Sequence, residues 1–193
     1  MSQVLFNSIQ QKVQLSEIEM EQCRGFFLAK KLPKKHYLLR AGEVCAYIAF
    51  VEQGLLRSYT IDAKGNEHVL QFAPEGWWIS DNYSFLTGEP SSYFIDALER
   101  AELLLLKCRA MEEMLQKVPK MERFFRLLMQ NNLIAQQRRT LGTLSFSAEE
   151  RYIRLLNQYP EIVQRAPQHL IASYLGITPE TLSRIRKKIA SRA

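Results

Sequence analysis

The first half of the chain carries short apolar runs separated by turn-forming residues, whereas the second half carries apolar residues at helical spacing. The short runs lie at 47–51, 55–61, 68–72, 93–98 and 103–107. Several short strands with turn signals between them are typical of an antiparallel sandwich or barrel. Gly65 lies between Lys64 and Asn66, and glycine adopts a positive φ at little cost, so this stretch predicts a hairpin between two of the strands.

Helical spacing dominates the second half of the chain. Residues 109–118 predict a short helix, and residues 120–144 predict one long helix because they contain no proline. Ser147 and Glu150 form a capping-box pattern, in which the two side chains bond N–H groups at the start of a helix. This pattern predicts a further helix that runs to about residue 158.

The predicted long helix has two rows of residues at a spacing of seven. One row contains Leu127, Ile134 and Leu141, and the adjoining row contains Phe124, Asn131 and Arg138. Such a spacing favours pairing with another helix, and a polar asparagine in the seam favours a dimer. A single amphipathic helix lying on the sandwich is the alternative. We expect both, with one face of the helix on the sandwich and another face on a partner helix. The expected dimer contacts are made by Leu127, Asn131, Ile134 and Leu141.

Two helices joined by a tight turn are predicted near the C-terminus, starting at Pro167. The first helix runs to Leu175, and Gly176 ends it because glycine tolerates the left-handed conformation that follows many helices. Thr178 suits the N-cap of the second helix, and Pro179 suits its first position, where the missing N–H is not needed. Helix, glycine turn and helix together form a helix-turn-helix pattern.

The net charge of +6 is concentrated at the C-terminus. Residues 164–193 contain six basic residues and one acidic residue, so they carry +5, and the rest of the chain carries +1. A localised positive charge indicates an anionic partner. On the second predicted helix, Arg184 can donate two hydrogen bonds to guanine, and Glu180 can accept one from cytosine. A plain surface ion pair is the alternative, but the surrounding helix-turn-helix and basic run favour DNA.

The motif IASYLGITPETLSRIRKKI at 171–189 resembles the recognition motif of the Crp/Fnr family of bacterial transcription regulators. That family joins a jelly roll of the cyclic-nucleotide-binding type, a long dimerisation helix and a C-terminal winged helix-turn-helix. The resemblance implies an α+β fold with a sensor domain at 1–119, a dimerisation helix and hinge at 120–146, and a DNA-binding domain at 147–193. It also implies a homodimer on double-stranded DNA with an inverted-repeat operator, RNA polymerase as a further partner, and an unidentified small effector.

The same resemblance implies two sets of site residues. The residues implied to contact DNA are Thr178, Glu180, Thr181, Arg184, Lys187 and Lys188. The implied effector pocket contains Asp81, Ser91, Ser92 and Tyr93. In cyclic-nucleotide-binding members a carboxylate holds the ribose and an arginine holds the cyclic phosphate. Asp81 matches the first position, but Ser91 stands at the second, so we expect a regulator that does not depend on cAMP. A regulator that responds to a cyclic nucleotide or another small ligand is the alternative.

Other function classes find less support in the sequence. A jelly-roll metalloenzyme needs clustered histidines, but the three histidines are scattered, and the GxSxG motif of hydrolases is absent. The three cysteines lack the spacing of a zinc or iron–sulfur site. We therefore expect no enzyme, no metal and no cofactor. A signalling module that does not bind DNA is a distant alternative, against which the basic helix-turn-helix argues.

The sequence also bears on location. It contains no run of about 18 apolar residues, and its first residues lack the charged and apolar regions of a signal peptide. We expect a cytoplasmic protein with no membrane partner.

Overall fold

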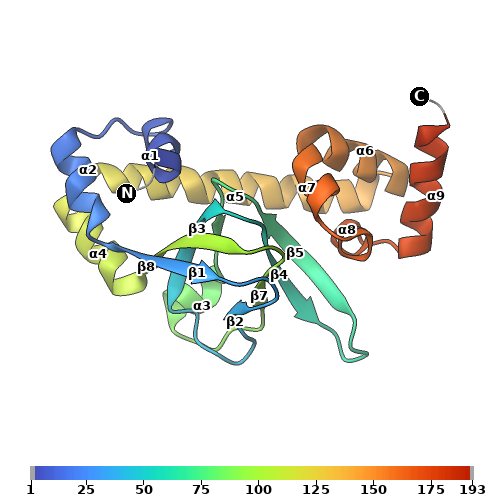
Figure 1. Cartoon of the computed structure of the whole chain (residues 1–193), viewed down its shortest axis with the longest axis horizontal. Helices are drawn as coiled ribbons and strands as arrows, with labels where there is room; N and C mark the ends of the chain where they lie inside the picture. Colours follow the sequence, from blue (N-terminus) through green and yellow to red (C-terminus); the bar gives the residue numbers. More distant parts are fainter. Residues whose placement is uncertain (1–2, 192–193) are drawn as a thin grey trace. The chain divides into compact units, whose positions relative to one another are not determined.

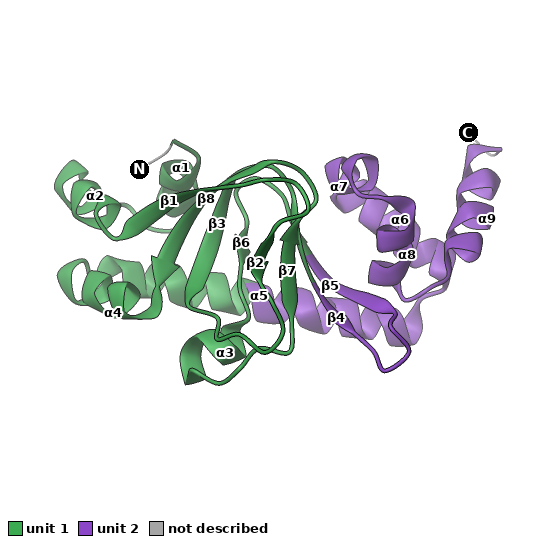
Figure 2. Ribbon diagram, turned by 60° about the horizontal axis from the view of Figure 1, so that its bottom comes forward, with its two compact units in different colours: residues 1–58, 72–131 green, residues 59–71, 132–193 purple. Residues whose placement is uncertain are grey.

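The computed structural model describes residues 3–191, which form two compact units (Figure 2). Unit 1 consists of Met1–Ser58 and Phe72–Asn131, and unit 2 consists of Tyr59–Gln71 and Asn132–Ala193. The division falls inside one long helix, and it assigns the outer part of a β-hairpin to unit 2. Figure 1 gives the order of the elements along the chain.

Unit 1 combines strands with helices. Its helices are α1 (Gln3–Gln10), α2 (Glu17–Arg24), α3 (Asn82–Thr87), α4 (Cys108–Lys117) and the first part of α5 (Lys120–Ser145). Its strands are β1 (Phe27–Leu32), β2 (Tyr37–Leu39), β3 (Tyr47–Gln53), β6 (Trp78–Ile79), β7 (Phe94–Ala97) and β8 (Ala101–Lys107). Two further strands, β4 (Leu56–Ile61) and β5 (Glu67–Ala73), form the hairpin whose residues 59–71 belong to unit 2.

The strands form two four-stranded sheets, in the orders β1-β8-β3-β6 and β2-β7-β4-β5. In the first sheet β8 lies between β1 and β3 and pairs antiparallel with both, so Leu106 lies opposite both Phe27 and Ile48. A strand that is buried on both faces is expected to be apolar along its length, and residues 103–106 of β8 are all buried leucines. The antiparallel sheets confirm the predicted jelly roll.

Gly54, between β3 and β4, occupies a position that only glycine fits. Its φ is +98°, and a Cβ atom there would lie 2.6 Å from the backbone oxygen of Arg100. Its N–H donates a 2.7 Å hydrogen bond to Glu75. The chain therefore turns tightly from one sheet to the other with its backbone against the β7–β8 connection.

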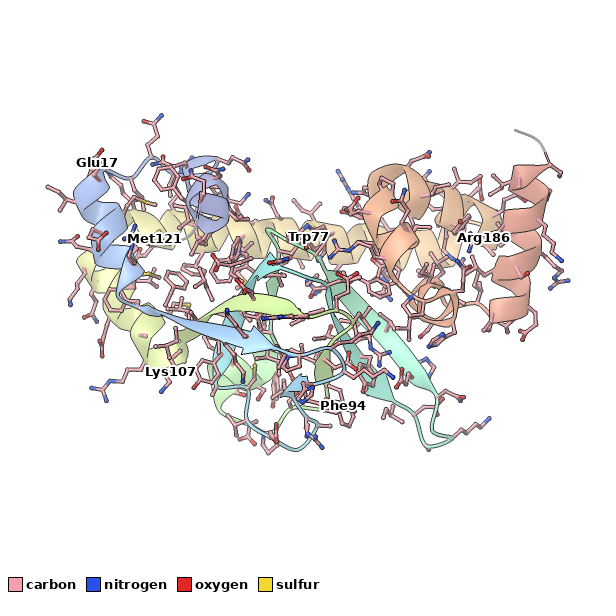
Figure 3. The ribbon with its side chains drawn as sticks, viewed as in Figure 1. Glu17, Trp77, Phe94, Lys107, Met121 and Arg186 are labelled. Carbon is pink, nitrogen blue, oxygen red and sulfur yellow. The ribbon has the colours of Figure 1, made fainter. Side chains whose placement is uncertain are left out.

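An aromatic cluster attaches the start of α5 to the first sheet. The Trp78 ring lies 5.2 Å from that of Phe50, 5.7 Å from that of Phe125 and 6.1 Å from that of Phe124, centroid to centroid. Met121, one turn earlier on the helix, is completely buried, and its position near the start of α5 is labelled in Figure 3. Phe124, which has the spacing of the row adjoining the seam, is buried in this core, so it lies on the part of the helix that packs on the sheet.

Unit 2 is mostly helical. After α5 come α6 (Ala148–Gln158), α7 (Pro160–Arg165), α8 (Gln168–Leu175) and α9 (Pro179–Ala190). The predicted capping box at the start of α6 is confirmed, since Ser147 and Glu150 each bond the backbone N–H of the other. No strand follows Lys107 within residues 108–191, so the wing that the resemblance implied has no counterpart there.

Some elements could not be predicted from the pattern of apolar and polar residues. β1 has exposed residues at four consecutive positions, including Lys30 and Lys31, so it shows no alternation. It is a strand because it pairs with β8 over its whole length. β2, β6 and α7 are too short for a period to be recognised, at three, two and six residues.

Candidate functional sites

The turn between α8 and α9 has the geometry that the sequence predicted. Gly176 adopts the left-handed conformation with φ of 66°. Its N–H donates to the Ser173 oxygen, and the Ile177 N–H donates to the Ala172 oxygen, both at 3.0 Å. These two bonds form a Schellman motif, which satisfies carbonyl groups at the end of α8. Thr178 then caps α9 by accepting a 3.3 Å bond from the Thr181 N–H.

The two helices of this motif bury one face and expose the other. Leu182 and Ile185 of α9 are buried, together with Leu170, Ile171 and Leu175 of α8. The opposite face of α9 is exposed. The exposed polar side chains of α9 are Glu180, Ser183, Arg184, Arg186, Lys187 and Lys188, with Thr181 partly buried beside them. The positions of the side chains on α9 can be followed in Figure 3, where Arg186 is labelled.

The charges on this face are held in defined ways. The pKa of Glu180 is lowered, first by its own backbone N–H and then by the Thr178 hydroxyl, so this carboxylate is ionised at neutral pH. Arg184 donates a 3.2 Å bond to the Thr181 hydroxyl. Lys188 forms an ion pair with Glu149 of α6. The Lys188 ammonium thus fastens α9 to α6, a contact that sequence reasoning missed because Glu149 lies 39 positions earlier.

An apolar row is exposed on the part of α5 that lies in unit 2. Ile134 is 45% exposed, Leu141 60% and Leu144 79%. Asn131, at the end of unit 1, is also exposed, and Leu127 is half-buried. Exposed apolar residues on one helix are typical of an interaction surface. The dimer contacts expected from the sequence are therefore accessible on this chain and stay a prediction.

The predicted effector residues form a bonded cluster in unit 1. Asp81 is the N-cap of α3 and accepts bonds from the N–H groups of Tyr83 and Ser84. Its second oxygen accepts a 2.7 Å bond from the Ser91 hydroxyl, which in turn accepts one from the Tyr93 N–H at 2.9 Å. Asp81 and Ser91 are both buried. The carboxylate thus has protein partners on both oxygens.

The remaining groups of this region are also bonded or exposed. The Ser84 hydroxyl accepts from the Cys45 N–H and donates to the Glu89 oxygen. Ser92, the fourth residue of the predicted pocket, is exposed. Sequence reasoning missed the role of Ser84, whose completely buried hydroxyl joins α3 to the β2–β3 connection.

Arg57, the buried arginine of β4, does not lie free beside this cluster. It forms a bidentate pair with Asp96 of β7, with Nε–Oδ1 at 2.8 Å and Nη2–Oδ2 at 3.0 Å. Both side chains are buried. A buried guanidinium in such a pair is costly to separate, because its partner would be left as an uncompensated charge.

A small cavity of about 240 Å³ lies near the β2–β3 connection in unit 1. Its lining is Leu38, Leu39, Glu43, Val44, Cys45, Ala46, Tyr47 and Ile95. Drug-sized ligands occupy pockets of about 300 Å³ or more, so the cavity is below that range. Between residues 3 and 191 no cluster of three metal-ligating side chains occurs, and no helix there is long and apolar enough to cross a membrane.

Comparison with known proteins finds a matching domain model and similar regulatory proteins. The model of the cyclic nucleotide-binding domain matches residues 29–118. The chain is 28% identical to the fumarate and nitrate reduction regulatory protein of Vibrio cholerae, over 89% of this chain and 72% of that protein.

Solved structures agree with this result. FixK2 from Bradyrhizobium japonicum is 19% identical, with a TM-score of 0.72 over 86% of this chain and 85% of the other. A regulator from Eubacterium rectale, described as a member of the crp/fnr family, is 15% identical, with a TM-score of 0.70 over 92% of this chain and 85% of the other. At these identities the structures establish the fold. The matched domain and the similar regulatory protein, together with the helix-turn-helix, support a transcriptional regulator of the Crp/Fnr type.

Proposed function

We propose that this protein is a cytoplasmic homodimer that binds an inverted-repeat operator through α9 and does not depend on a cyclic nucleotide. The observation that carries the proposal is the exposed polar face of α9, presented by a glycine turn and a capped first helical turn. The N-terminal residues of a recognition helix are those that reach base edges in the major groove. Glu180 and Arg184 occupy that part of the helix.

The roles of the individual side chains follow from their chemistry. Arg184 reads guanine through two hydrogen bonds, and Glu180 accepts from a cytosine amino group. Thr178, Thr181 and Lys187 contact phosphates, which position the helix without reading sequence. Lys188, paired with Glu149, adds positive charge to the same surface. The Arg184–Thr181 bond holds the guanidinium beside the start of α9, where it can reach a base edge.

Dimerisation completes the reading surface. The exposed row on α5 supports pairing with the same helix of a second copy, since a two-fold interface brings one patch against itself. In such a dimer two copies of α9 lie about 34 Å apart, one turn of DNA. RNA polymerase is a further partner of the bound dimer.

The bonded cluster at Asp81 supports independence from cAMP. A cyclic phosphate carries a full negative charge, and an arginine holds such a group through two charge-assisted bonds. Ser91 offers one neutral hydroxyl, which already donates to Asp81. Arg57 is bound to Asp96 and is not free to replace the missing guanidinium.

Selection of duplexes from a random pool tests DNA binding. The recovered sequences should share an inverted repeat, and the affinity for the selected duplex should fall steeply with salt. Calorimetry with cAMP and cGMP tests the effector. Micromolar binding that raises operator affinity tenfold, a coupling of about 1.4 kcal/mol, would overturn the proposed independence while leaving DNA binding intact.

The second candidate is a regulator that responds to another small ligand. The cavity beside Cys45 favours it, because the Cys45 N–H bonds the Ser84 hydroxyl and so links the cavity wall to α3. A fluorescence-based thermal shift screen of small apolar compounds tests this candidate. A ligand at this cavity would raise Tm, and Ala46→Phe, which places a larger side chain at its lining, should reduce the shift.

A further inference from the structure

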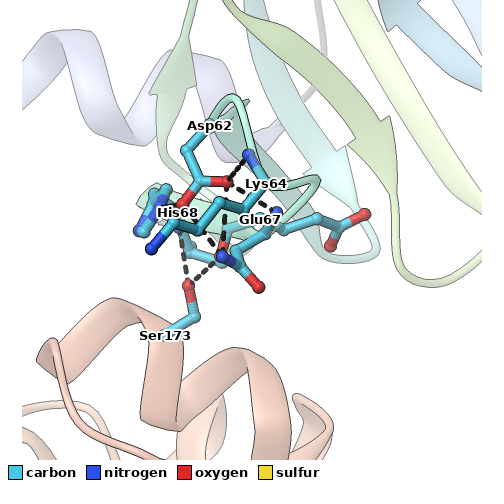
Figure 4. Close-up of polar contacts among 7 residues, drawn as sticks. Asp62, Lys64, Glu67, His68 and Ser173 are labelled. Atoms are coloured by element: carbon cyan, nitrogen blue, oxygen red, sulfur yellow. Dashed lines mark hydrogen bonds and ion pairs between the residues drawn. The ribbon is translucent and has the colours of Figure 1, made fainter.

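The β4–β5 hairpin and α8 are joined by side-chain bonds that the proposed function does not use. Both segments belong to unit 2, as does the Asn132–Ser145 part of α5. The hairpin is stiffened at its turn by Asp62, whose carboxylate accepts bonds from the N–H groups of Lys64 and Asn66 and from the His68 ring (Figure 4). A defined strand edge is thereby presented to the helices.

Ser173 of α8 binds this edge as a neighbouring strand would. Its hydroxyl donates to the Glu67 oxygen at 2.6 Å and accepts from the Val69 N–H at 3.0 Å (Figure 4). β5 is the outer strand of its sheet, so main-chain groups on its open side have no strand partner. Residues two apart on a strand direct these groups to the same side, which lets one hydroxyl bond both.

Arg139 of α5 adds a second connection. Its guanidinium donates to the oxygens of Leu70 and Val69 on β5 and, at 3.1 Å, to the oxygen of Tyr174 on α8. It also lies 4.2 Å from the centre of the Tyr174 ring. The Tyr174 oxygen belongs to the last turn of α8, where carbonyl groups lack helical partners and a cation is favourable. Arg139 therefore joins α5, β5 and α8.

The direction of α8 determines the direction of α9. The Schellman bonds of the turn and the buried Leu182 leave α9 little freedom relative to α8. A dimer that reads an inverted repeat needs both α9 helices at a set spacing. If helices α6–α9 moved freely relative to α5, they would lose conformational entropy on binding DNA, and this loss would weaken the complex.

We propose that Arg139 and Ser173 are positioning residues that hold α8 against the β4–β5 hairpin and thereby preset α9 for its operator. The proposal rests on the proposed DNA-binding function. Neither residue is part of the apolar core formed by α6–α9. Their removal therefore weakens the contact between α8 and the β4–β5 hairpin and leaves that core intact.

The test uses the full chain and two measurements. Hydrogen exchange at the Val69 amide, measured without DNA, reports the contact between α8 and the hairpin. The exchange rate should rise at least about tenfold in Ser173→Ala because the amide loses its acceptor. Affinity for a duplex selected by the wild type, and for a scrambled duplex of the same composition, reports the positioning. The selected duplex should bind about tenfold more weakly to Ser173→Ala and to Arg139→Ala, with little change on the scrambled duplex.

Matched variants separate positioning from a general loss of structure. Ser173→Thr keeps the hydroxyl and should behave as the wild type in both measurements. Arg126→Ala removes an exposed arginine elsewhere on α5 and should change neither measurement. Faster exchange at Val69 with an unchanged preference for the selected duplex would overturn the positioning role alone. If the wild type selects no duplex from the pool, the proposed function fails, and the positioning role fails with it.

Discussion

The polar groups around Asp81 and those on α9 contrast in how their hydrogen-bonding capacity is used. Around Asp81 the groups are buried and bonded to one another, so a ligand that entered would have to displace protein partners. On α9 the polar groups are exposed, and bonds such as the one from Arg184 to the Thr181 hydroxyl orient them while most of their polar atoms stay accessible. A binding surface needs polar groups that are oriented but not saturated, and among these two regions only α9 meets that condition.

Disrupting the α5 row should have the largest effect, because the two α9 surfaces act only as a pair. Ile134→Glu with Leu141→Glu places like charges against their symmetry mates, and a buried unpaired charge is strongly destabilising. We expect a dimer in the wild type and a monomer in the variant by sedimentation at micromolar concentration. Gln136→Glu, an exposed change on the same helix, should leave the dimer intact. A monomeric wild type would contradict the assignment of the row.

Removing the outer groups of α9 should come next. Arg184→Ala should cost about 1–3 kcal/mol on the selected duplex and relax preference at one base pair per half-site. Binding measurements with single-base variants of the duplex check this. Equal losses on selected and scrambled duplexes would show that Arg184 contacts phosphate instead of a base.

Opening the Asp81 cluster should affect folding and not DNA reading. Ser91→Ala leaves one buried carboxylate oxygen without its partner, and such a loss costs about 1–3 kcal/mol of unfolding free energy. Urea denaturation measures it. Ser92→Ala, at the exposed neighbouring position, is the control. If Ser91→Ala lost operator affinity at unchanged stability, the cluster would be part of the regulatory mechanism after all.

A smaller effect should separate two neighbouring lysines of α9. Lys187→Ala should weaken binding to all duplexes alike and lower the salt slope by about one. Lys188 already pairs with Glu149, so Lys188→Ala should change the slope less. The slopes of log K against log salt concentration provide the comparison. A larger change for Lys188 would mean that it leaves Glu149 for a phosphate.

The smallest effect concerns acid. The pKa of Asp62 is lowered from its ordinary value of 3.8, first by the Asn66 side chain and then by His68. A group whose folded pKa is depressed contributes stability above its unfolded pKa, and that contribution is lost as pH falls through the folded value. Lys64 and Glu67 also lie at this turn, and their charges contribute to the pH dependence of both proteins. Asp62→Asn removes only the Asp62 carboxyl and is therefore the reference. Thermal unfolding below pH 3.8 should show a steeper loss of Tm in the wild type than in Asp62→Asn.

Local signals in the sequence determined much of unit 2 and the main strands of unit 1. Ser147 with Glu150, and Gly176 with Thr178, act within a few residues, so their caps and turns form as predicted. The apolar runs of β3 and β8 are buried, and the long helix extends over Lys120–Ser145, close to its predicted bounds.

Only the tertiary structure decided which polar groups are already bonded. Ser91 meets Asp81 from ten positions away, Arg57 meets Asp96 from 39, and Ser173 meets Glu67 from 106. Such pairs leave no period in the sequence, because each depends on how separate elements approach. The same reason explains Phe124, whose spacing fits the seam although packing placed it in the core. The sequence by itself determined the elements and the charged face of α9, whereas folding determined which side chains stay free to bind.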